Sequence, residues 1–101
     1  MADPTTVQQW TDQYNQLRSN LDNVNGAVEG YIQNGYSDSP ALYEAQRLQL
    51  QLEYQLNQHI ESAYTPELND TYNTYKDSRP IRRYDVPIDG ILYNNTGQPL
   101  A

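Results

Sequence analysis

Cysteine and phenylalanine are both absent from this 101-residue chain, and only six Lys and Arg residues accompany thirteen Asp and Glu residues. Without cysteine there is no disulfide framework, no thiolate zinc site and no cysteine nucleophile. The net charge of −7 argues against direct binding to nucleic acid, because such affinity comes from neutralising phosphates with Lys and Arg. No apolar run approaches the length of a signal peptide or a membrane span, so we expect a cytosolic product with no membrane partner.

Large aliphatic side chains are also scarce. Leu, Ile and Val together number 19, close to the composition at which a chain buries too little apolar surface to offset its ordering entropy. Ten Tyr and one Trp partly compensate, and these side chains suit half-wet interfaces. At this length the chain forms at most one domain. We therefore expect a marginal monomer that is stabilised as a homo-oligomer or by other protein subunits within a larger assembly.

The clearest pattern is a series of apolar residues spaced alternately three and four apart between residues 7 and 31. This spacing places the side chains on one stripe of an α-helix, which requires a partner helix along its length, as in a coiled coil. A second helix of the same chain is the favoured partner, because the flanking positions lack the charge pairs of an open two-chain coiled coil. This packing seam consists of Val7, Trp10, Tyr14, Leu17, Leu21, Val24, Val28 and Tyr31.

The first helix has clear start signals. Asp3 as the N-cap and Pro4 at the first helical position predict a helix over about residues 4–34. Gly26 and Gly30 each cost about 1 kcal/mol relative to Ala inside a helix. A break near Gly26 is therefore an alternative, although a continuous helix is favoured.

Ser39-Pro40 repeats the same start signal and predicts a second helix over about residues 40–65, which Pro66 ends. The leucines alternate with polar residues, as they do in a half-buried strand, but the segment consists mainly of strong helix formers, and a helix is favoured. Its main apolar stripe consists of Leu48, Leu52, Leu56 and Ile60. Its second apolar face, Leu50 and Tyr54, should touch another neighbour.

These elements predict an all-α fold in which residues 1–65 form an antiparallel helical hairpin. Prolines and glycines exclude a long helix after residue 65, so residues 66–101 are predicted to form an extended, mostly irregular C-terminal arm. We expect this arm to lie on other subunits. A short flap folded back on the hairpin is the alternative. The predicted arm contacts are Arg79, Ile81, Arg82, Arg83, Tyr84, Val86, Ile88, Ile91, Leu92 and Tyr93.

Residues that could carry catalysis are sparse. His59 is the only histidine, and it has no metal-binding partner four residues away, so we expect it on a solvated helix face. The acidic residues are scattered singly, and there is no phosphate-binding loop. The basic residues of the arm either bind an acidic partner or neutralise the chain's own acidic helices. We expect no catalytic residue, no metal and no cofactor, and therefore no enzyme.

A cysteine-free helical hairpin with an extended arm and 21 Asn and Gln residues resembles the small structural proteins of tailed-bacteriophage virions. The resemblance rests on composition over the whole chain and on no motif, so it assigns no functional residues. It implies a head–tail connector, neck or capsid-reinforcing subunit that is assembled in the host cytoplasm and located in the virion.

Two other functions stay open. A small acidic inhibitor of a host nucleic-acid enzyme would mimic DNA by lining its carboxylates along one surface, but the acidic residues here are sparse and separated by amides. The other open function is that of a bacterial adaptor or a secreted helical-hairpin protein. The Trp-x-Gly turn expected of small secreted hairpins is missing, since Trp10 is followed by Thr11-Asp12.

Removal of residues 79–101 is predicted to leave most of the helix content intact, because both long helices lie before residue 66, but to abolish incorporation into the assembly. Circular dichroism measures the first effect, and recovery of the truncated chain in the assembled particle measures the second. Unchanged incorporation would contradict a binding role for the arm.

Overall fold

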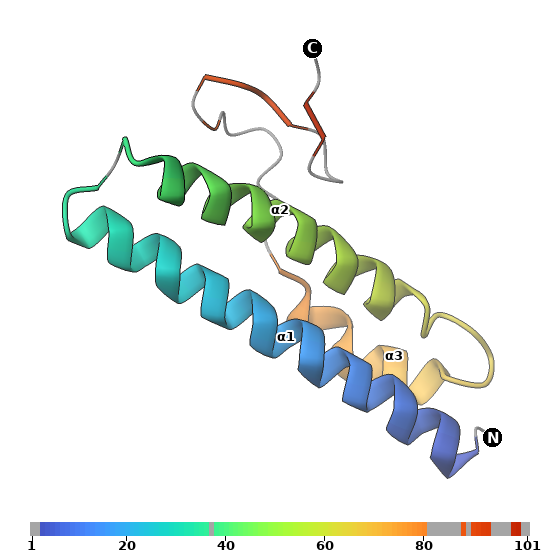
Figure 1. Ribbon diagram of the computed structural model, residues 1–101. Helices are drawn as coiled ribbons and strands as arrows, with labels where there is room; N and C mark the ends of the chain where they lie inside the picture. The colour runs from blue at the N-terminus through green and yellow to red at the C-terminus, as the bar shows by residue number, and fades with distance from the viewer. Residues whose placement is uncertain (1–2, 37, 81–87, 89, 94–97, 100–101) are drawn as a thin grey trace.

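Two long antiparallel helices dominate the structure, a computed structural model that describes residues 3–36, 38–80, 88, 90–93, 98 and 99. Helix α1 (Pro4–Gln33) and helix α2 (Pro40–Glu61) lie side by side, and the short helix α3 (Asn69–Tyr75) continues into a 3-10 turn at Lys76–Ser78. Figure 1 shows the hairpin, with α3 against the end that contains the N-terminus. This arrangement confirms the predicted all-α helical hairpin.

The starts of both long helices follow the predicted signals. The Asp3 carboxylate accepts a hydrogen bond from the Thr5 N–H at 2.8 Å, and the Ser39 hydroxyl accepts one from the Ala41 N–H at 3.2 Å. A proline occupies the first turn in each case, where its missing N–H costs no hydrogen bond. Helix α1 continues through Gly26 without a break, as favoured from the sequence.

The turn between α1 and α2 is closed by backbone hydrogen bonds. Gly35 has a φ of 81°, a left-handed conformation that glycine adopts at little cost. The Tyr36 N–H donates to the Tyr31 carbonyl at 2.9 Å, and the Gly35 N–H donates to the Ile32 carbonyl at 3.2 Å. This pair of bonds satisfies the last carbonyls of α1 and directs the chain back toward α2.

The open end of the hairpin is held together by Trp10 and His59. The Trp10 indole N–H donates to the His59 carbonyl and to the Ser62 hydroxyl, both at 3.1 Å. In return, His59 Nε2 lies 2.8 Å from the Trp10 carbonyl, and because a carbonyl only accepts, this nitrogen must be the donor. The two rings stack with their centroids 4.4 Å apart. His59 is therefore half-buried in an aromatic contact, which corrects the expectation of a solvated position.

The main core lies at this end of the hairpin, between α1, α2 and α3. Its buried side chains come from both long helices and from the turn after α2, and Leu68, Tyr72 and Tyr75 cover it from the α3 side. The buried members are Trp10, Tyr14, Leu21, Leu52, Leu56, Ile60 and Ala63.

Helix α3 lies in the segment that the sequence predicts to be an extended arm. The interval between Pro66 and Pro80 leaves room for about two turns of helix, although Asn, Asp, Thr and Tyr are weak helix formers. Helix α3 is stabilised by packing instead, because the Tyr75 ring lies 5.1 Å from the Trp10 ring and 4.5 Å from the Tyr14 ring. Helix α2 also ends at Glu61, earlier than residue 65.

Replacement of Ile60 by Ala should lower the free energy of unfolding by about 2–5 kcal/mol, because Ile60 is fully buried and the change leaves a cavity. Leu48→Ala is the matched control on the same helix. Leu48 is 44% exposed, so its loss should change the free energy by no more than about 0.5 kcal/mol in dilute solution. Urea unfolding followed by circular dichroism measures both, and equal losses would contradict this core.

Candidate protein-binding surface

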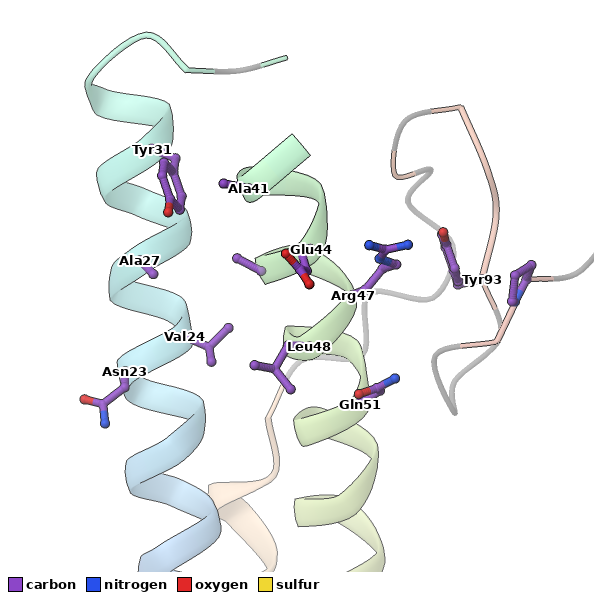
Figure 2. Close-up of a pocket in the computed structure, with 12 residues that line it drawn as sticks. Asn23, Val24, Ala27, Tyr31, Ala41, Glu44, Arg47, Leu48, Gln51 and Tyr93 are labelled. Carbon is purple, nitrogen blue, oxygen red and sulfur yellow. The ribbon is translucent and has the colours of Figure 1, made fainter. Parts of the chain in front are cut away.

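A shallow hollow of about 790 Å³ lies between α1 and α2, toward the end of the hairpin that contains the turn. Figure 2 shows the side chains that line it, which come mainly from the two long helices. The apolar part of the lining from the two helices consists of Val24, Ala27, Tyr31, Ala41, Ala45 and Leu48. Tyr93 and Pro99 of the C-terminal segment complete it.

The hollow exists because the packing seam of α1 meets small side chains on α2. Val24 and Tyr31 belong to the seam but are only half-buried, and Ala27 is exposed. Across from them α2 presents Ala41 and Ala45, whose single methyl groups are too small to fill the space between the helices. The earlier seam residues are better covered, since Trp10, Tyr14 and Leu21 are buried, although Val7 and Leu17 are half-buried. Val28, near the turn, is also buried.

Leu48 points out of the core, although the sequence places it on the main apolar stripe of α2. Leu52, Leu56 and Ile60 are buried as expected, whereas Leu48 is 44% exposed. A stripe of residues four apart drifts by about 40° per step around an α-helix, so Leu48 and Ile60 lie about 120° apart. That drift carries Leu48 from the core to the edge of the hollow.

The polar residues beside the hollow include one acidic and one basic side chain. Glu44, Arg47 and Gln51 are all exposed along α2. The ion pairs within the described part of the chain join Arg18 to Asp22 and Arg79 to Glu61, and therefore include neither Glu44 nor Arg47. Among the residues that the structure describes, neither charge is therefore engaged in an ion pair.

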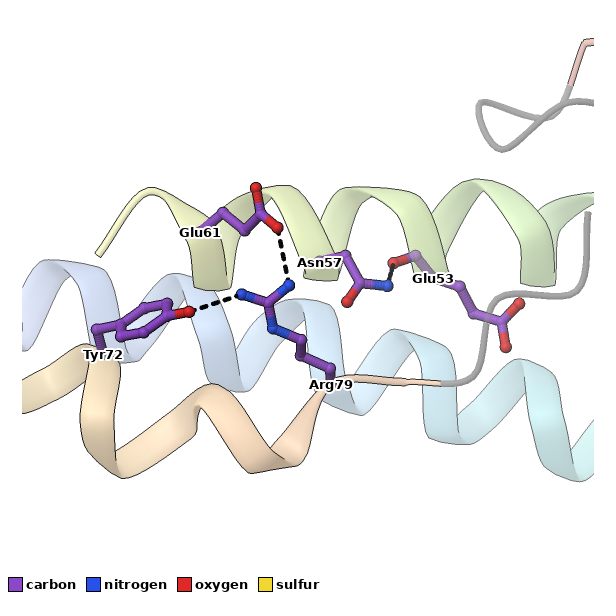
Figure 3. Close-up of polar contacts among 5 residues, drawn as sticks. All are labelled: Glu53, Asn57, Glu61, Tyr72 and Arg79. Carbon is purple, nitrogen blue, oxygen red and sulfur yellow. Dashed lines mark hydrogen bonds and ion pairs between the residues drawn. The ribbon is translucent and has the colours of Figure 1, made fainter. Parts of the chain in front are cut away.

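One stripe of α2 is polar but buried, which no pattern in the sequence indicated. Gln49, Glu53 and Asn57 are each less than 10% exposed, at a spacing of four residues. Figure 3 shows the Asn57 amide donating to the Glu53 carbonyl, at 2.9 Å. The Gln49 amide donates to the Asn25 side chain on α1 at 2.6 Å. This side of α2 therefore belongs to the internal packing of the chain.

Arg79, a predicted arm contact, binds within its own chain. Its guanidinium donates to the Glu61 carboxylate at 2.8 Å and to the Tyr72 hydroxyl at 3.0 Å (Figure 3). The hydrogen bond that Arg79 donates to Glu61 is the main cause that raises the pKa of Arg79 above its ordinary value, so the side chain stays charged. This pair joins the residues after α3 to the end of α2, in line with the alternative that the basic residues neutralise the chain's own acids.

The second apolar face of α2 has a neighbour from the same chain. Leu50 is 3% exposed and packs with Ile88 and Tyr93, beside Tyr43, while Tyr54 is half-buried. This contact agrees with the alternative prediction, in which the C-terminal segment folds back on the hairpin as a short flap. Ile91 and Leu92 are 43% and 44% exposed. The remaining predicted arm contacts, Ile81, Arg82, Arg83, Tyr84 and Val86, lie outside the described residues.

Within the described ranges, no group of three or more His, Cys, Asp or Glu residues could hold a metal ion. None of the helices described is long and apolar enough to cross a membrane. A scan against protein-family models and searches of curated proteins and of solved structures found no match to this chain.

Replacement of Arg79 by Lys keeps the charge but removes the planar guanidinium group, which donates to Glu61 and Tyr72 at the same time. We expect a loss of less than about 1 kcal/mol in the free energy of unfolding, because both partners of the ion pair are partly exposed. A basic side chain with a raised pKa loses its contribution to the free energy of unfolding only as the pH rises through that pKa. The pKa of Arg79 is raised above its ordinary value and so lies well above pH 9. The difference between wild type and variant should therefore stay constant between about pH 7 and pH 9. Urea midpoints across that range test this, and a difference that vanishes toward pH 9 would contradict it.

Proposed function

We propose that the protein is a non-enzymatic structural or assembly subunit that acts through protein–protein contacts. The observation that carries this proposal is the hollow beside Leu48. A chain with only 19 Leu, Ile and Val residues leaves part of its longest apolar seam uncovered there. Uncovered apolar surface of this kind marks a site where another protein binds.

Further exposed apolar side chains lie near the turn of the hairpin. Ile32, which directly follows Tyr31 of the hollow, is 52% exposed, and Tyr36 in the turn is 59% exposed. Tyrosine provides a large apolar ring with a polar hydroxyl and is enriched at the centres of protein interfaces. The turn end of the hairpin thus offers more apolar contact area to a partner than its number of aliphatic residues suggests.

Within this class, we propose a component of a tailed-bacteriophage virion, such as a head–tail connector, neck or capsid-reinforcing subunit. The support is compositional: an amide-rich, cysteine-free helical hairpin suits a permanent, partly hydrated interface, because amides lose less solvation on burial than charges do. The partners would be further protein subunits of the particle, including copies of this chain.

The structure weakens the alternative of an acidic inhibitor that mimics DNA. Glu53 is buried, and Glu61 is already paired with Arg79. Two of the three acidic residues of α2 are therefore committed within the chain, which leaves Glu44 beside the hollow. A phosphate mimic requires a row of free carboxylates instead.

Sedimentation of the native protein from the cells that produce it tests the proposal. We expect the chain to sediment with a large particle in a fixed ratio to other structural subunits. Leu48→Asp should move it to the free fraction, because a carboxylate would be desolvated in the interface. Asn73→Asp adds the same charge on an exposed position of α3 and should stay in the particle.

Two results would contradict the proposal. One is a wild-type chain that sediments free of any particle. The other is a chain that sediments with a single nucleic-acid enzyme, which would support the inhibitor instead.

A further inference from the structure

Glu44 and Arg47 form a self-complementary pair of charges on α2. They lie three residues apart at exposed positions of α2, and both line the hollow together with Leu48. In Figure 2, Leu48 points toward Val24 of α1 and Arg47 points toward Tyr93. A second α2 turned end for end would bring its base opposite the acid of the first and its acid opposite the base. Such a pattern fits the isologous contact of a two-fold dimer.

We propose that a second copy of this chain binds here, with the two α2 helices antiparallel around a two-fold axis near residue 46. This inference rests on the proposed function and names the first partner of the same surface. The dimer joins the hollows of the two copies around Leu48.

The register follows from helix geometry. With the axis at residue 46, position 44 of one copy faces position 48 of the other. The Cα positions of Glu44 and the partner's Arg47 are then offset by about 1.5 Å along the helix axis, and an arginine side chain easily spans this offset. The two Leu48 side chains lie about 6 Å apart along the same direction, near the centre of the contact.

Small residues on the same helix allow close approach. Ala41 is exposed and faces the partner's Gln51 in this register, and Ala45 is half-buried and lies opposite the partner's Arg47. A methyl group at each position lets the partner's longer side chain lie against the helix. The contact thereby covers Leu48 with the aliphatic stem of arginine and with the second Leu48.

The Glu44 and Arg47 pair favours a second copy over a partner of one charge sign, although the net charge opposes self-association. Two copies each carry a net charge of −7 and repel one another, so their contact needs a basic residue in the interface. Before residue 70 the chain has only Arg18 and Arg47, and Arg18 is paired with Asp22 on its own helix. A partner of one charge sign would leave either Glu44 or Arg47 facing a like charge, whereas a second copy satisfies both.

The dimer should be weak. Helix α2 has 22 residues. That length is about 33 Å, and a strip about 10 Å wide buries well under the roughly 800 Å² per partner of a stable interface. Association therefore needs a high protein concentration, which neighbouring sites in an assembly supply.

Charge exchange provides the test, with sedimentation equilibrium of the purified full-length chain up to high micromolar concentration. The wild type should dimerise. Glu44→Arg and Arg47→Glu should each weaken dimerisation by about tenfold, because each change makes two attractive pairs repulsive. The double variant E44R/R47E restores both pairs and should dimerise within about threefold of wild type.

Two control variants make the same changes of charge elsewhere. Glu67→Arg and Lys76→Glu lie at exposed positions around α3 and should leave the wild-type dimer unchanged apart from the effect of net charge. Circular dichroism checks that all variants keep their helix content.

A monomeric wild type would overturn this inference, and so would a double variant that fails to recover. Neither result bears on the proposed function, which is decided by whether the native chain sediments with a particle.

Discussion

The reciprocal contact between Trp10 and His59 is the interaction on which the rest of the structure depends. Each residue donates a hydrogen bond to the other's backbone carbonyl, and their rings stack between the start of α1 and the end of α2. The same indole supports Tyr75 of α3. One contact thus fixes the register of the hairpin and the position of the third helix, in a chain with few aliphatic residues for either purpose. A large aromatic ring with an N–H donor is suited to this double role.

The concentration of large side chains at one end of the hairpin leaves the other end underfilled. The main core lies among Trp10, Leu56, Ile60 and α3. In the first two turns of α2, by contrast, the small side chains of Ala41 and Ala45 line the hollow. The hollow beside Leu48 is the consequence. Here a difference in side-chain volume along two helices produces one end with a packed core and another end with exposed apolar surface. The proposed assembly role follows from that asymmetry.

The features predicted from the sequence depend on local chemistry. Asp3 and Ser39 as caps act within two or three residues, and the apolar spacing of α1 depends only on helix geometry. The features that were not predicted depend on contacts between distant segments. Helix α3 forms from weak helix formers because Tyr75 packs on α1, and Leu50 is covered by Ile88 and Tyr93, which lie about forty residues away in the sequence.

The candidate surface was only partly predictable for the same reason. The seam of α1 was visible from spacing alone, but no sequence pattern showed which of its positions would stay uncovered, since that depends on Ala41 and Ala45 across the hairpin. The burial of Gln49, Glu53 and Asn57 was equally hidden, because polar residues on a helix are ordinarily solvated. The most direct measurement of the central claim is site-specific photo-crosslinking in the cells that produce the protein, with a photoreactive residue at position 48 and a reference at position 73 of α3. The account predicts adducts with a second copy or a structural subunit at position 48 in excess of those at position 73. Equal yields at both positions would contradict it.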